Sequence, residues 1–434
     1  MRHLGATGVG RGHTASSPLG SAFLFFIAYV LTLGSALLPL AFLGRLPLWG
    51  VIETGQAEPM RWALAACIAV AVASWLARGR LWPWSTVMGL LAGVATFCLV
   101  AGARMNWVGL LSLAALLAMV ALAGQWFRRT IWFPLSCMLV LAMLATLSSL
   151  PGRRDSRQVH PQVGVMTALP LFWREGAGAA GLADAPRTQK WLDATQVRAR
   201  PLDRLDAGAL QGFDRLLLAQ PRLLRPAELV TLDNWVRGGG RLVMLADPLL
   251  VWPSSLPLGH RLRPPVTSLL DPLLSHWGLE LEPASGPQLQ RHVLRDGAIL
   301  LGEGASRFHK LGGTCRLEQG GLMALCHLGK GKVRLIADAD LLDDRLWLAD
   351  SSLPLLPATL SADNVALIDH WLADPDGSRL RKLPNRIVDD QALFAGVRWM
   401  LLLGLVWAAM GWWLQIRRDR LGKAGEEMGN GAIS

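Results

Sequence analysis

Charged residues are scarce in this sequence. Asp, Glu, Lys and Arg together make up 17% of its 434 residues, whereas a soluble protein of ordinary composition carries about 25%. The shortage is concentrated in the first 150 residues, and hydrophobic residues reach 52% of the whole chain. This distribution predicts a membrane region at the beginning of the chain, followed by a water-soluble part.

The sequence also lacks the common catalytic signatures. It has no G-x-S-x-G nucleophile turn, no H-E-x-x-H pair and no phosphate-binding loop of the Walker type. We therefore expect no catalytic residues of these kinds, no ATP hydrolysis by the chain itself and no cofactor. The net charge is +11, but no dense Lys/Arg run with interleaved aromatics is present. Nucleic acid is accordingly not expected as a partner.

Long apolar runs are present. The last, residues 392–416, is long enough to cross a bilayer as a C-terminal transmembrane helix, and a cluster of Arg and Lys follows it directly. We expect residues 20–150 to form an N-terminal transmembrane bundle of about five helices, after a disordered tail at residues 1–19. The five runs of this bundle lie at 20–43, 62–76, 84–103, 107–124 and 131–150, and 62–76 is the shortest.

The distribution of Lys and Arg predicts the orientation of these helices. If successive spans alternate in direction, most basic residues of the short connections lie on the same side of the membrane. Arg153, Arg154 and Arg157 lie on the opposite side. We expect a multi-pass protein of a bacterial inner membrane, with cytoplasmic tails at 1–19 and 417–434 and a periplasmic domain at 151–391. The span interiors contain almost no ionisable residues, which favours an anchor or packing platform over a conduction path.

The segment 151–391 alternates strand-like and helix-like runs. Apolar strands are predicted at 162–169, 195–201, 213–220 and 241–247, and a helix at 225–240 separates the last two. This strand–helix–strand unit predicts an α/β domain with a mostly parallel sheet. Further elements are predicted as a helix at 268–278, short strands near 279–302, a hairpin and strand at 313–338, and a helix at 362–374.

Two cysteines of this segment, Cys315 and Cys326, flank Gly320 and Gly321 in the predicted hairpin. If the glycines form a two-residue turn, the cysteines oppose each other at a distance that suits a disulfide. An oxidising compartment favours that bond, and two free cysteines packed in a sheet are the alternative. A zinc site is not expected, because the cysteines and His327 lack a fourth ligand.

Acidic residues follow two of the predicted strands. Asp247 ends one, and Asp338, Asp340, Asp343 and Asp344 follow another. Parallel sheets place ligands at the carboxyl ends of their strands, so these side chains could converge and bind a cation or a basic partner. The alternative is that they cap helices and form turns. We regard Asp247, Asp338, Asp340 and Asp343 as the candidate ligand-binding or partner-binding residues.

Three stretches of the α/β segment follow a recognisable pattern. The first is LLLAQPRLLRPAELVTLDNWVRGGGRLVMLADP, with Gly238, Gly239, Asp247 and Pro248. The second is GKGKVRLIADADLLDD, with Asp338, Leu341 and Leu342, and the helix NVALIDHWL follows it. In this order they resemble GldG-like proteins and related families of unknown function, which are auxiliary components of ABC-type transport systems. The resemblance covers roughly residues 163–373.

The resemblance implies a flavodoxin-like sandwich similar to the class I glutamine amidotransferase domain, with an ABC permease and ATPase as partners. Amidotransferases carry a cysteine nucleophile at a strand-to-helix turn, whereas here the strand leads into Asp247-Pro248. We therefore expect a non-catalytic accessory subunit. An enzyme that uses the acidic strand ends, with or without a divalent metal, and a subunit whose bundle forms a transport pathway are the alternatives.

Overall fold

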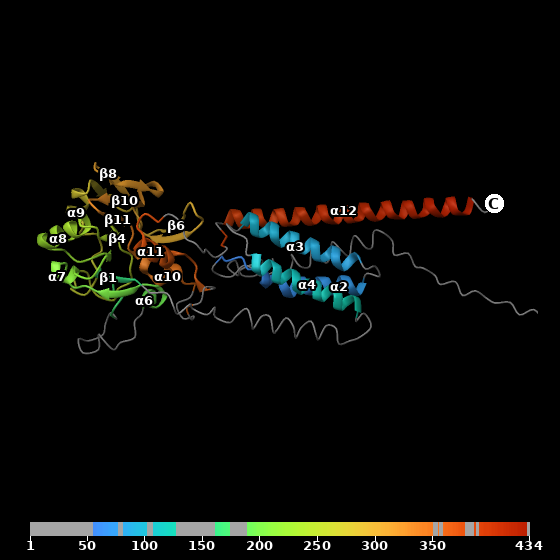
Figure 1. Ribbon diagram of the computed structural model, residues 1–434, viewed down its shortest axis with the longest axis horizontal. Helices are drawn as coiled ribbons and strands as arrows, with labels where there is room; N and C mark the ends of the chain where they lie inside the picture. The colour runs from blue at the N-terminus through green and yellow to red at the C-terminus, as the bar shows by residue number, and fades with distance from the viewer. Residues whose placement is uncertain are drawn as a thin grey trace, which may run out of the picture. The chain divides into compact units, whose positions relative to one another are not determined.

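The protein forms two compact units, which are seen in a computed structural model (Figure 1). One unit comprises Met1–Ile52, Ala57–Leu150 and Asp389–Ser434, and the other comprises Glu53–Gln56 and Pro151–Val388. The tail predicted at 1–19 and the spans predicted at 20–43 and 131–150 lie outside the described residues. The structure describes residues 55–76, 81–101, 107–126, 161–173, 189–349, 355, 359–377, 386–387 and 390–431.

The first unit is helical. Three of its helices contain apolar stretches long enough to cross a membrane: Pro83–Ala101, Trp107–Trp126 and Gln391–Gly411. These stretches agree with the predictions at 84–103, 107–124 and 392–416. The run predicted at 62–76 belongs to a shorter apolar helix, Pro59–Ser74, so its expected full span is not supported. The helices are η1 (Pro59–Trp62), α2 (Ala63–Leu76), α3 (Leu81–Ala101), α4 (Trp107–Trp126) and α12 (Asp390–Gly431).

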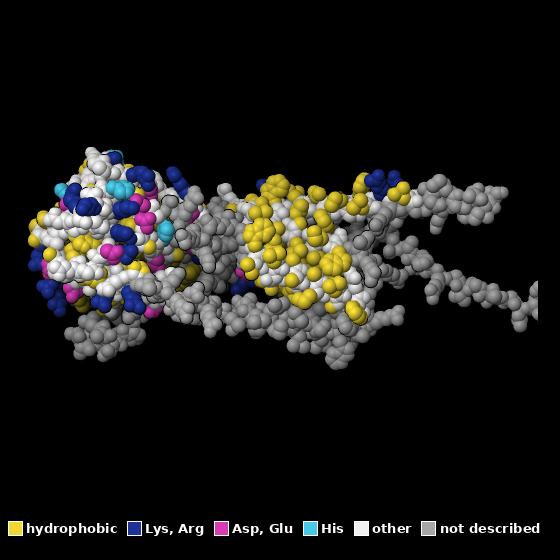
Figure 2. All heavy atoms as spheres, in the orientation of Figure 1, with side chains coloured by type: hydrophobic (Ala, Val, Ile, Leu, Met, Phe, Trp, Pro, Cys, Tyr) yellow, Lys and Arg dark blue, Asp and Glu magenta, His cyan; other side chains and the backbone are white. Residues whose placement is uncertain are grey.

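Helices α3 and α12 pack closely along their length. At one end of α3, a Cβ added to Gly396 of α12 would lie 2.8 Å from Cβ of Ala101, so the glycine permits the close approach. At the other end, the indole Nε1 of Trp407 donates a hydrogen bond to the carbonyl of Ser85 at 3.2 Å. The surface of these helices that Figure 2 shows is largely apolar, and Leu111, Leu122 and Val406 are among the exposed side chains, as expected for helices in contact with lipid.

The second unit is built on a seven-stranded sheet with the order β2-β1-β3-β4-β11-β10-β9. Strands β2, β1, β3, β4 and β11 run parallel, and β10 and β9 complete the sheet as an antiparallel extension. The prediction of a mostly parallel sheet is confirmed. The strands are β1 (Gln162–Thr167), β2 (Arg198–Pro201), β3 (Arg215–Ala219), β4 (Arg241–Leu245), β9 (Arg316–Glu318), β10 (Met323–Leu328) and β11 (Gly331–Ile336).

Both faces of this sheet are covered, because side chains of successive strand residues point to opposite sides. Leu217 and Val243 belong to a core that includes α11 (Asn364–Ala373). Leu216 and Met244 belong to a second core that includes α8 (Pro226–Arg237) and α9 (Asp271–His276). After their first residues, Arg215 and Arg241, strands β3 and β4 are therefore apolar, as buried parallel strands require.

Short elements complete the unit. The segment between β4 and β11 contains two small antiparallel pairs, β5 with β8 and β6 with β7, in addition to the β9–β10 hairpin. β8 and the four-residue helices α6, α7 and α10 were not predicted. These elements are β5 (Leu279–Leu281), β6 (Leu289–Val293), β7 (Ile299–Glu303), β8 (Phe308–Lys310), α6 (Trp191–Ala194), α7 (Ala207–Leu210) and α10 (Asp344–Trp347).

The three glycines after α8 form a tight connection to β4, so the helix ends before the predicted residue 240. The helix ends at Arg237, and Gly239 has φ +123°, a conformation that favours glycine. A Cβ on Gly240 would lie 2.3 Å from the ring of Trp235, so the bare backbone lets the chain pass the indole. This connection begins the strand that ends at Asp247.

Candidate functional site: a buried carboxylate cluster

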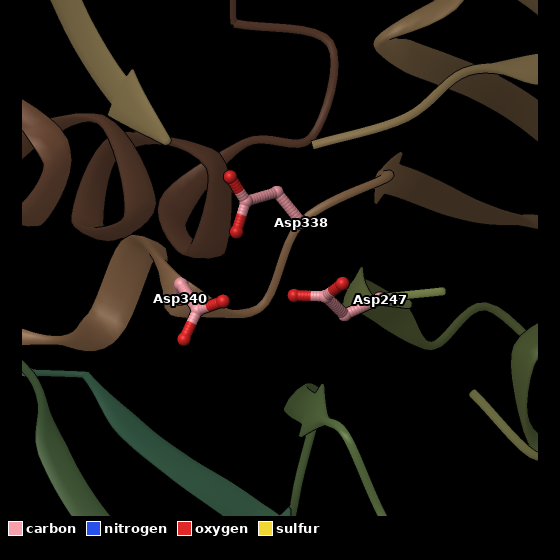
Figure 3. Close-up of side chains that lie close together, drawn as sticks. All are labelled: Asp247, Asp338 and Asp340. Atoms are coloured by element: carbon pink, nitrogen blue, oxygen red, sulfur yellow. The ribbon is translucent and has the colours of Figure 1, made fainter. Parts of the chain in front are cut away.

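Three of the candidate aspartates meet at one edge of the sheet. Asp247 follows β4, while Asp338 and Asp340 follow β11, the neighbouring parallel strand. Because parallel neighbours end at the same edge, their following residues lie side by side. Each of the three carboxylates has an oxygen within 4.8 Å of the other two, and Figure 3 shows the side chains turned toward one another.

Asp247 is held by the chain segments on either side of it. Its Oδ1 accepts a hydrogen bond from the amide of Leu249 at 2.8 Å, and its Oδ2 accepts one from the amide of Ala339 at 2.9 Å. The side-chain amide of Gln220, at the end of β3, bonds both the backbone N–H and the carbonyl of Asp247 at 3.1 Å. These bonds fix the position of the carboxylate between β4 and β11.

Asp338 and Asp340 each accept a backbone hydrogen bond from the insertion between β4 and β11. Oδ2 of Asp338 accepts from the amide of Glu303 at 3.0 Å, and Oδ2 of Asp340 accepts from the amide of Val251 at 2.8 Å. Gly302 leaves room for the first carboxylate, because a Cβ there would lie 2.1 Å from Oδ2 of Asp338. The insertion between β4 and β11 thus folds back to hold the cluster.

The three side chains are completely buried. Burial raises the pKa of Asp247 to about 6, and burial followed by the charge of Asp247 raises the pKa of Asp340 to about 8. The pKa of Asp338 is raised well above its ordinary value by burial and by the charges of the other two carboxylates. Two unit charges 4.8 Å apart repel by about 3.5 kcal/mol at an effective dielectric constant of about 20.

Two oxygens of the cluster have no donor. Among the described residues, no hydrogen-bond donor reaches Oδ1 of Asp338 or Oδ1 of Asp340, although both atoms are buried. A buried charged oxygen without a partner is costly, and native proteins neutralise it by protonation, by a basic group or by a cation. The arrangement can therefore share protons or hold a positive ion.

Asp343 and Asp344 do not join the cluster. The carboxylate of Asp343 caps α10 by accepting from the amide of Arg345 at 3.0 Å, and it pairs with the guanidinium of Arg345 at 2.6 Å. Asp344 accepts from the amide of Lys190 at 3.2 Å. The expectation that Asp343 and Asp344 converge with the other acids is therefore wrong. The capping alternative describes Asp343, while Asp344 bonds the chain before α6.

Sequence reasoning missed Gln220 and Gly302, which position the carboxylates. Gln220 stands at the end of an apolar strand and has φ +40°, which is uncommon for a residue other than glycine. Its polar side chain after the run LLLA is the signal that could have indicated it. Gly302 lies in a short edge pair and resembles any other strand glycine in the sequence, so only the tertiary structure reveals its role.

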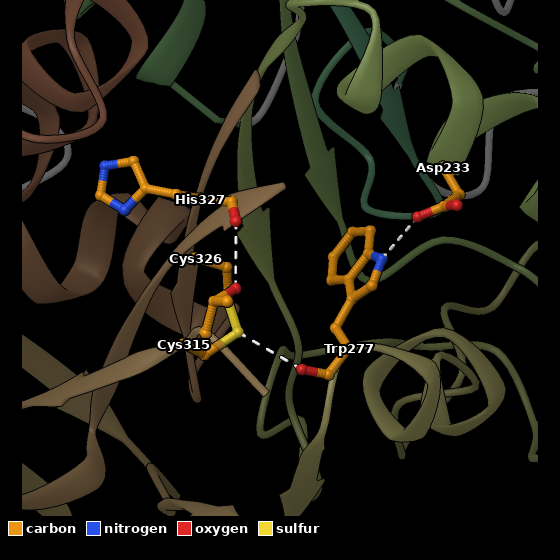
Figure 4. The surroundings of a disulfide bond; sticks show 6 residues. Asp233, Trp277, Cys315, Cys326 and His327 are labelled. Carbon is orange, nitrogen blue, oxygen red and sulfur yellow. Dashed lines mark hydrogen bonds between the residues drawn. A yellow bond between two sulfur atoms is a disulfide. The ribbon is translucent and has the colours of Figure 1, made fainter. Parts of the chain in front are cut away.

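Cys315 and Cys326 are joined by a disulfide in the structure, with Cα atoms 4.1 Å apart (Figure 4). The register of β9 and β10 pairs Leu325 with Arg316, so the next pair places the two cysteines opposite each other. The turn is longer than the expected two residues, because a 3₁₀ turn, Gln319–Gly321, forms part of it. The bond lies against the carbonyl of Trp277, 3.5 Å from Sγ of Cys315.

The structure resembles parts of several solved glycosidases at low similarity. One is an exo-β-1,4-mannosidase from Opitutaceae bacterium strain TAV5, with 11% identity and a TM-score of 0.28; the match covers 48% of this chain and 35% of the enzyme. Another is a β-galactosidase from Bacillus circulans sp. alkalophilus, with 12% identity and a TM-score of 0.25; the match covers 53% of this chain and 40% of the enzyme. The chain spans less than half the length of these enzymes. Similarity at this level carries no functional argument.

No curated protein matches the chain. Residues 160–291, however, match the family described as "ABC-type uncharacterized transport system". The match extends from just before β1 through the first stretch of the resemblance, and it includes Asp247. Asp338 and Asp340 lie beyond it. The match over residues 160–291 therefore supports placing this part of the chain with the auxiliary proteins of ABC-type transport systems.

Proposed function

We propose that the protein is a non-catalytic accessory subunit of an ABC-type transport or envelope assembly system, with its α/β domain in the periplasm. The observation that carries this proposal is the family match over residues 160–291, in a domain flanked along the chain by helices that could span a membrane. An ATPase and a permease encoded separately would be its partners. The domain would bind one of them, or the transported substrate.

The strand order supports a flavodoxin-like, amidotransferase-like fold for this domain. Its five parallel strands follow the order 2-1-3-4-5 when they are counted along the chain, which is the order of flavodoxin-like proteins. The chemistry of glutamine hydrolysis is not favoured. Asp247 occupies the end of β4, and both cysteines of the described domain lie in the β9–β10 hairpin. A binding role fits these residues better than glutamine hydrolysis does.

Purification from native membranes tests the partner. The full-length chain, isolated in mild detergent with a C-terminal tag, should carry a nucleotide-binding subunit and a permease in fixed ratio. An unrelated membrane protein with the same tag is the control. Purification of the chain without any nucleotide-binding subunit, while known transport complexes in the same extract remain intact, would reject the accessory role.

Reporter insertion tests the compartment. Leu258 is exposed in the segment between β4 and α9, so a reporter placed after it should leave the core intact. Alkaline phosphatase, which folds only outside the cytoplasm, should be active at this site, and green fluorescent protein inserted there should stay dark. The same reporters fused to the C-terminus should give the opposite result. Fluorescence at position 258 would overturn the periplasmic assignment.

The enzyme alternative uses the acidic cluster. The complete burial of Asp247, Asp338 and Asp340 gives a substrate no surface to reach, which favours a structural role for them. The pathway alternative concerns the helical unit. Replacing the span Trp107–Trp126 with an unrelated apolar helix should preserve complex assembly and transport if the unit is an anchor. Loss of transport with assembly intact would support a pathway instead.

A further inference from the structure

We propose that Asp247, Asp338 and Asp340 bind one divalent cation of the oxygen-preferring class, Mg²⁺, Ca²⁺ or Mn²⁺, inside the α/β domain. The site goes beyond the accessory role, since it concerns how the domain is held together. Its three ligands come from the ends of β4 and β11, which are separated in sequence by the whole insertion. An ion there would tie these two strand ends to each other.

The unpartnered oxygens carry the proposal. Oδ1 of Asp338 and Oδ1 of Asp340 are buried, and no donor among the described residues reaches them. The other oxygen of each carboxylate is already fixed by a backbone amide, of Glu303 and Val251 respectively. Each side chain is thus held by one oxygen and keeps a second, unbonded oxygen, and Figure 3 shows the carboxyl groups turned toward that of Asp247.

Basic side chains do not fill this role in the described part of the chain. No Lys or Arg nitrogen there lies within 4.0 Å of the three carboxylates. Arg345, the cation in the same loop, is occupied by Asp343 at 2.6 Å and by Glu303 at 3.7 Å. With no described basic group in place, the carboxylates either share protons or hold a small ion, and we propose the ion.

The donor set selects the class of ion. All three ligands are carboxylate oxygens within 4.8 Å of one another, and no sulfur or imidazole belongs to the group. Oxygen-only sites suit Mg²⁺, Ca²⁺ and Mn²⁺, whereas structural zinc sites use Cys and His. Three carboxylates carry more negative charge than one divalent ion neutralises, and the backbone amides on Asp247 and its neighbours offset the excess.

The test uses the full-length chain in detergent. Elemental analysis after desalting, or titration of chelator-treated protein with MgCl2, CaCl2 or MnCl2, should give one ion per chain. At an ion concentration about a hundred times Kd, the melting temperature of the domain should rise by roughly 5–10 °C over the chelated protein. Manganese also permits direct counting of bound ions by electron paramagnetic resonance.

Neutral variants of the same shape separate binding from folding. The double variant Asp338→Asn/Asp340→Asn removes two charges and should fold, but it should show no ion-dependent rise in melting temperature and at least about tenfold weaker manganese binding. Asp343→Asn changes a buried carboxylate of the same loop that already pairs with Arg345, so it should bind the ion as the wild type does.

Two results would overturn the site. The first is a wild-type chain that contains none of these metals after purification and whose melting temperature does not respond to any of the three ions. The carboxylates would then hold protons only. The second is manganese binding of unchanged affinity in the double variant, which would place the ion elsewhere. Neither result bears on whether an ATPase and a permease associate with the chain.

Discussion

The guanidinium of Arg386 is buried against the carboxylate of Asp363, the residue before α11. Asp363 also accepts a hydrogen bond from the amide of Ile299 at 2.9 Å, and Arg386 donates to the carbonyls of Leu360 and Ala362. Arg386 also forms an isolated antiparallel bridge with Gln56, so two short segments of the α/β unit that are far apart in the sequence pair with each other.

Loss of the Asp363 carboxylate should destabilise the domain strongly. Asp363→Ala leaves a buried guanidinium without its counter-ion, which typically costs about 3–5 kcal/mol of unfolding free energy. Arg316→Ala, at an exposed ion pair with Glu318, is the control and should cost less than about 1 kcal/mol. Urea unfolding followed by tryptophan fluorescence measures both. Equal midpoints for the two variants would show that the buried pair adds no stability.

Gly302 should not tolerate a side chain. The added Cβ of Gly302→Ala would lie 2.1 Å from Oδ2 of Asp338, and the buried carboxylate has little room to move. We expect a loss of about 1–3 kcal/mol in unfolding free energy, as for other overpacked cores. Gly312→Ala is the matched control, because nothing lies within 4 Å of a Cβ at that position. A Gly302→Ala variant as stable as Gly312→Ala would contradict the close packing around Asp338.

The disulfide should depend on the compartment. Cys315 and Cys326 are bonded to each other in the structure, so denatured protein from normal cells should label at two more thiols after reduction than before it. Cells without a periplasmic thiol oxidase should show no such gain at these two cysteines. Labelling of Cys315 and Cys326 before reduction in normal cells would mean that they are reduced and would argue against the periplasm.

The bond should also stabilise the domain. Cys315→Ala/Cys326→Ala removes a cross-link that closes a loop with a sequence separation of 11 residues, and disulfides of this kind contribute about 2–4 kcal/mol. Reducing agent should lower the urea midpoint of the wild type and leave that of the double variant unchanged. The reverse pattern would show that another thiol is responsible.

Glu228 should make stability depend on pH on the acid side. Its carboxylate accepts hydrogen bonds from the side chain and amide of Arg225 and from the amide of Leu205, and these lower its pKa from the ordinary value of 4.5. An acid with a lowered folded pKa stabilises the protein above its unfolded pKa and loses that contribution as the pH falls through the folded value.

Glu228→Gln should therefore destabilise the domain at pH 7 by about 0.5–2 kcal/mol, the range measured for helix caps. The difference from the wild type should shrink as the pH falls below 4.5. Glu280→Gln, at an exposed position of β5, should change stability little at either pH. Urea unfolding at pH 7 and pH 4 gives the comparison. A Glu228→Gln effect that grows at pH 4 would contradict the expected sign.

The parallel sheet and the meeting of Asp247 with Asp338 could be predicted because both follow from local patterns. Buried parallel strands are continuous apolar runs, and the residues after neighbouring strands must share an edge. The different position of Asp343 could not be predicted, because it depends on the single 3₁₀ turn, Asp340–Leu342, that leads the chain away from the cluster.

The groups that donate hydrogen bonds to the three aspartates are brought there by tertiary contacts, which leave little trace in the sequence. Glu303 and Val251 contribute only backbone amides, which any residue could supply. β8 has three residues, too few for a periodic pattern to be visible. The three helices that could span a membrane were easier to predict, because about 20 consecutive apolar residues are rarely found in a soluble domain.

Both rims of the large sheet are short. β2 has four residues, Arg198 to Pro201, and includes two arginines and a proline. β9 has three residues, and Cys315, directly before it, is joined by a disulfide to Cys326 of β10. Charge, proline and shortness all hinder the addition of a further strand from another molecule. Copies of this domain crowded on one membrane would thus have little tendency to polymerise through their sheets, and association would have to use side-chain surfaces instead.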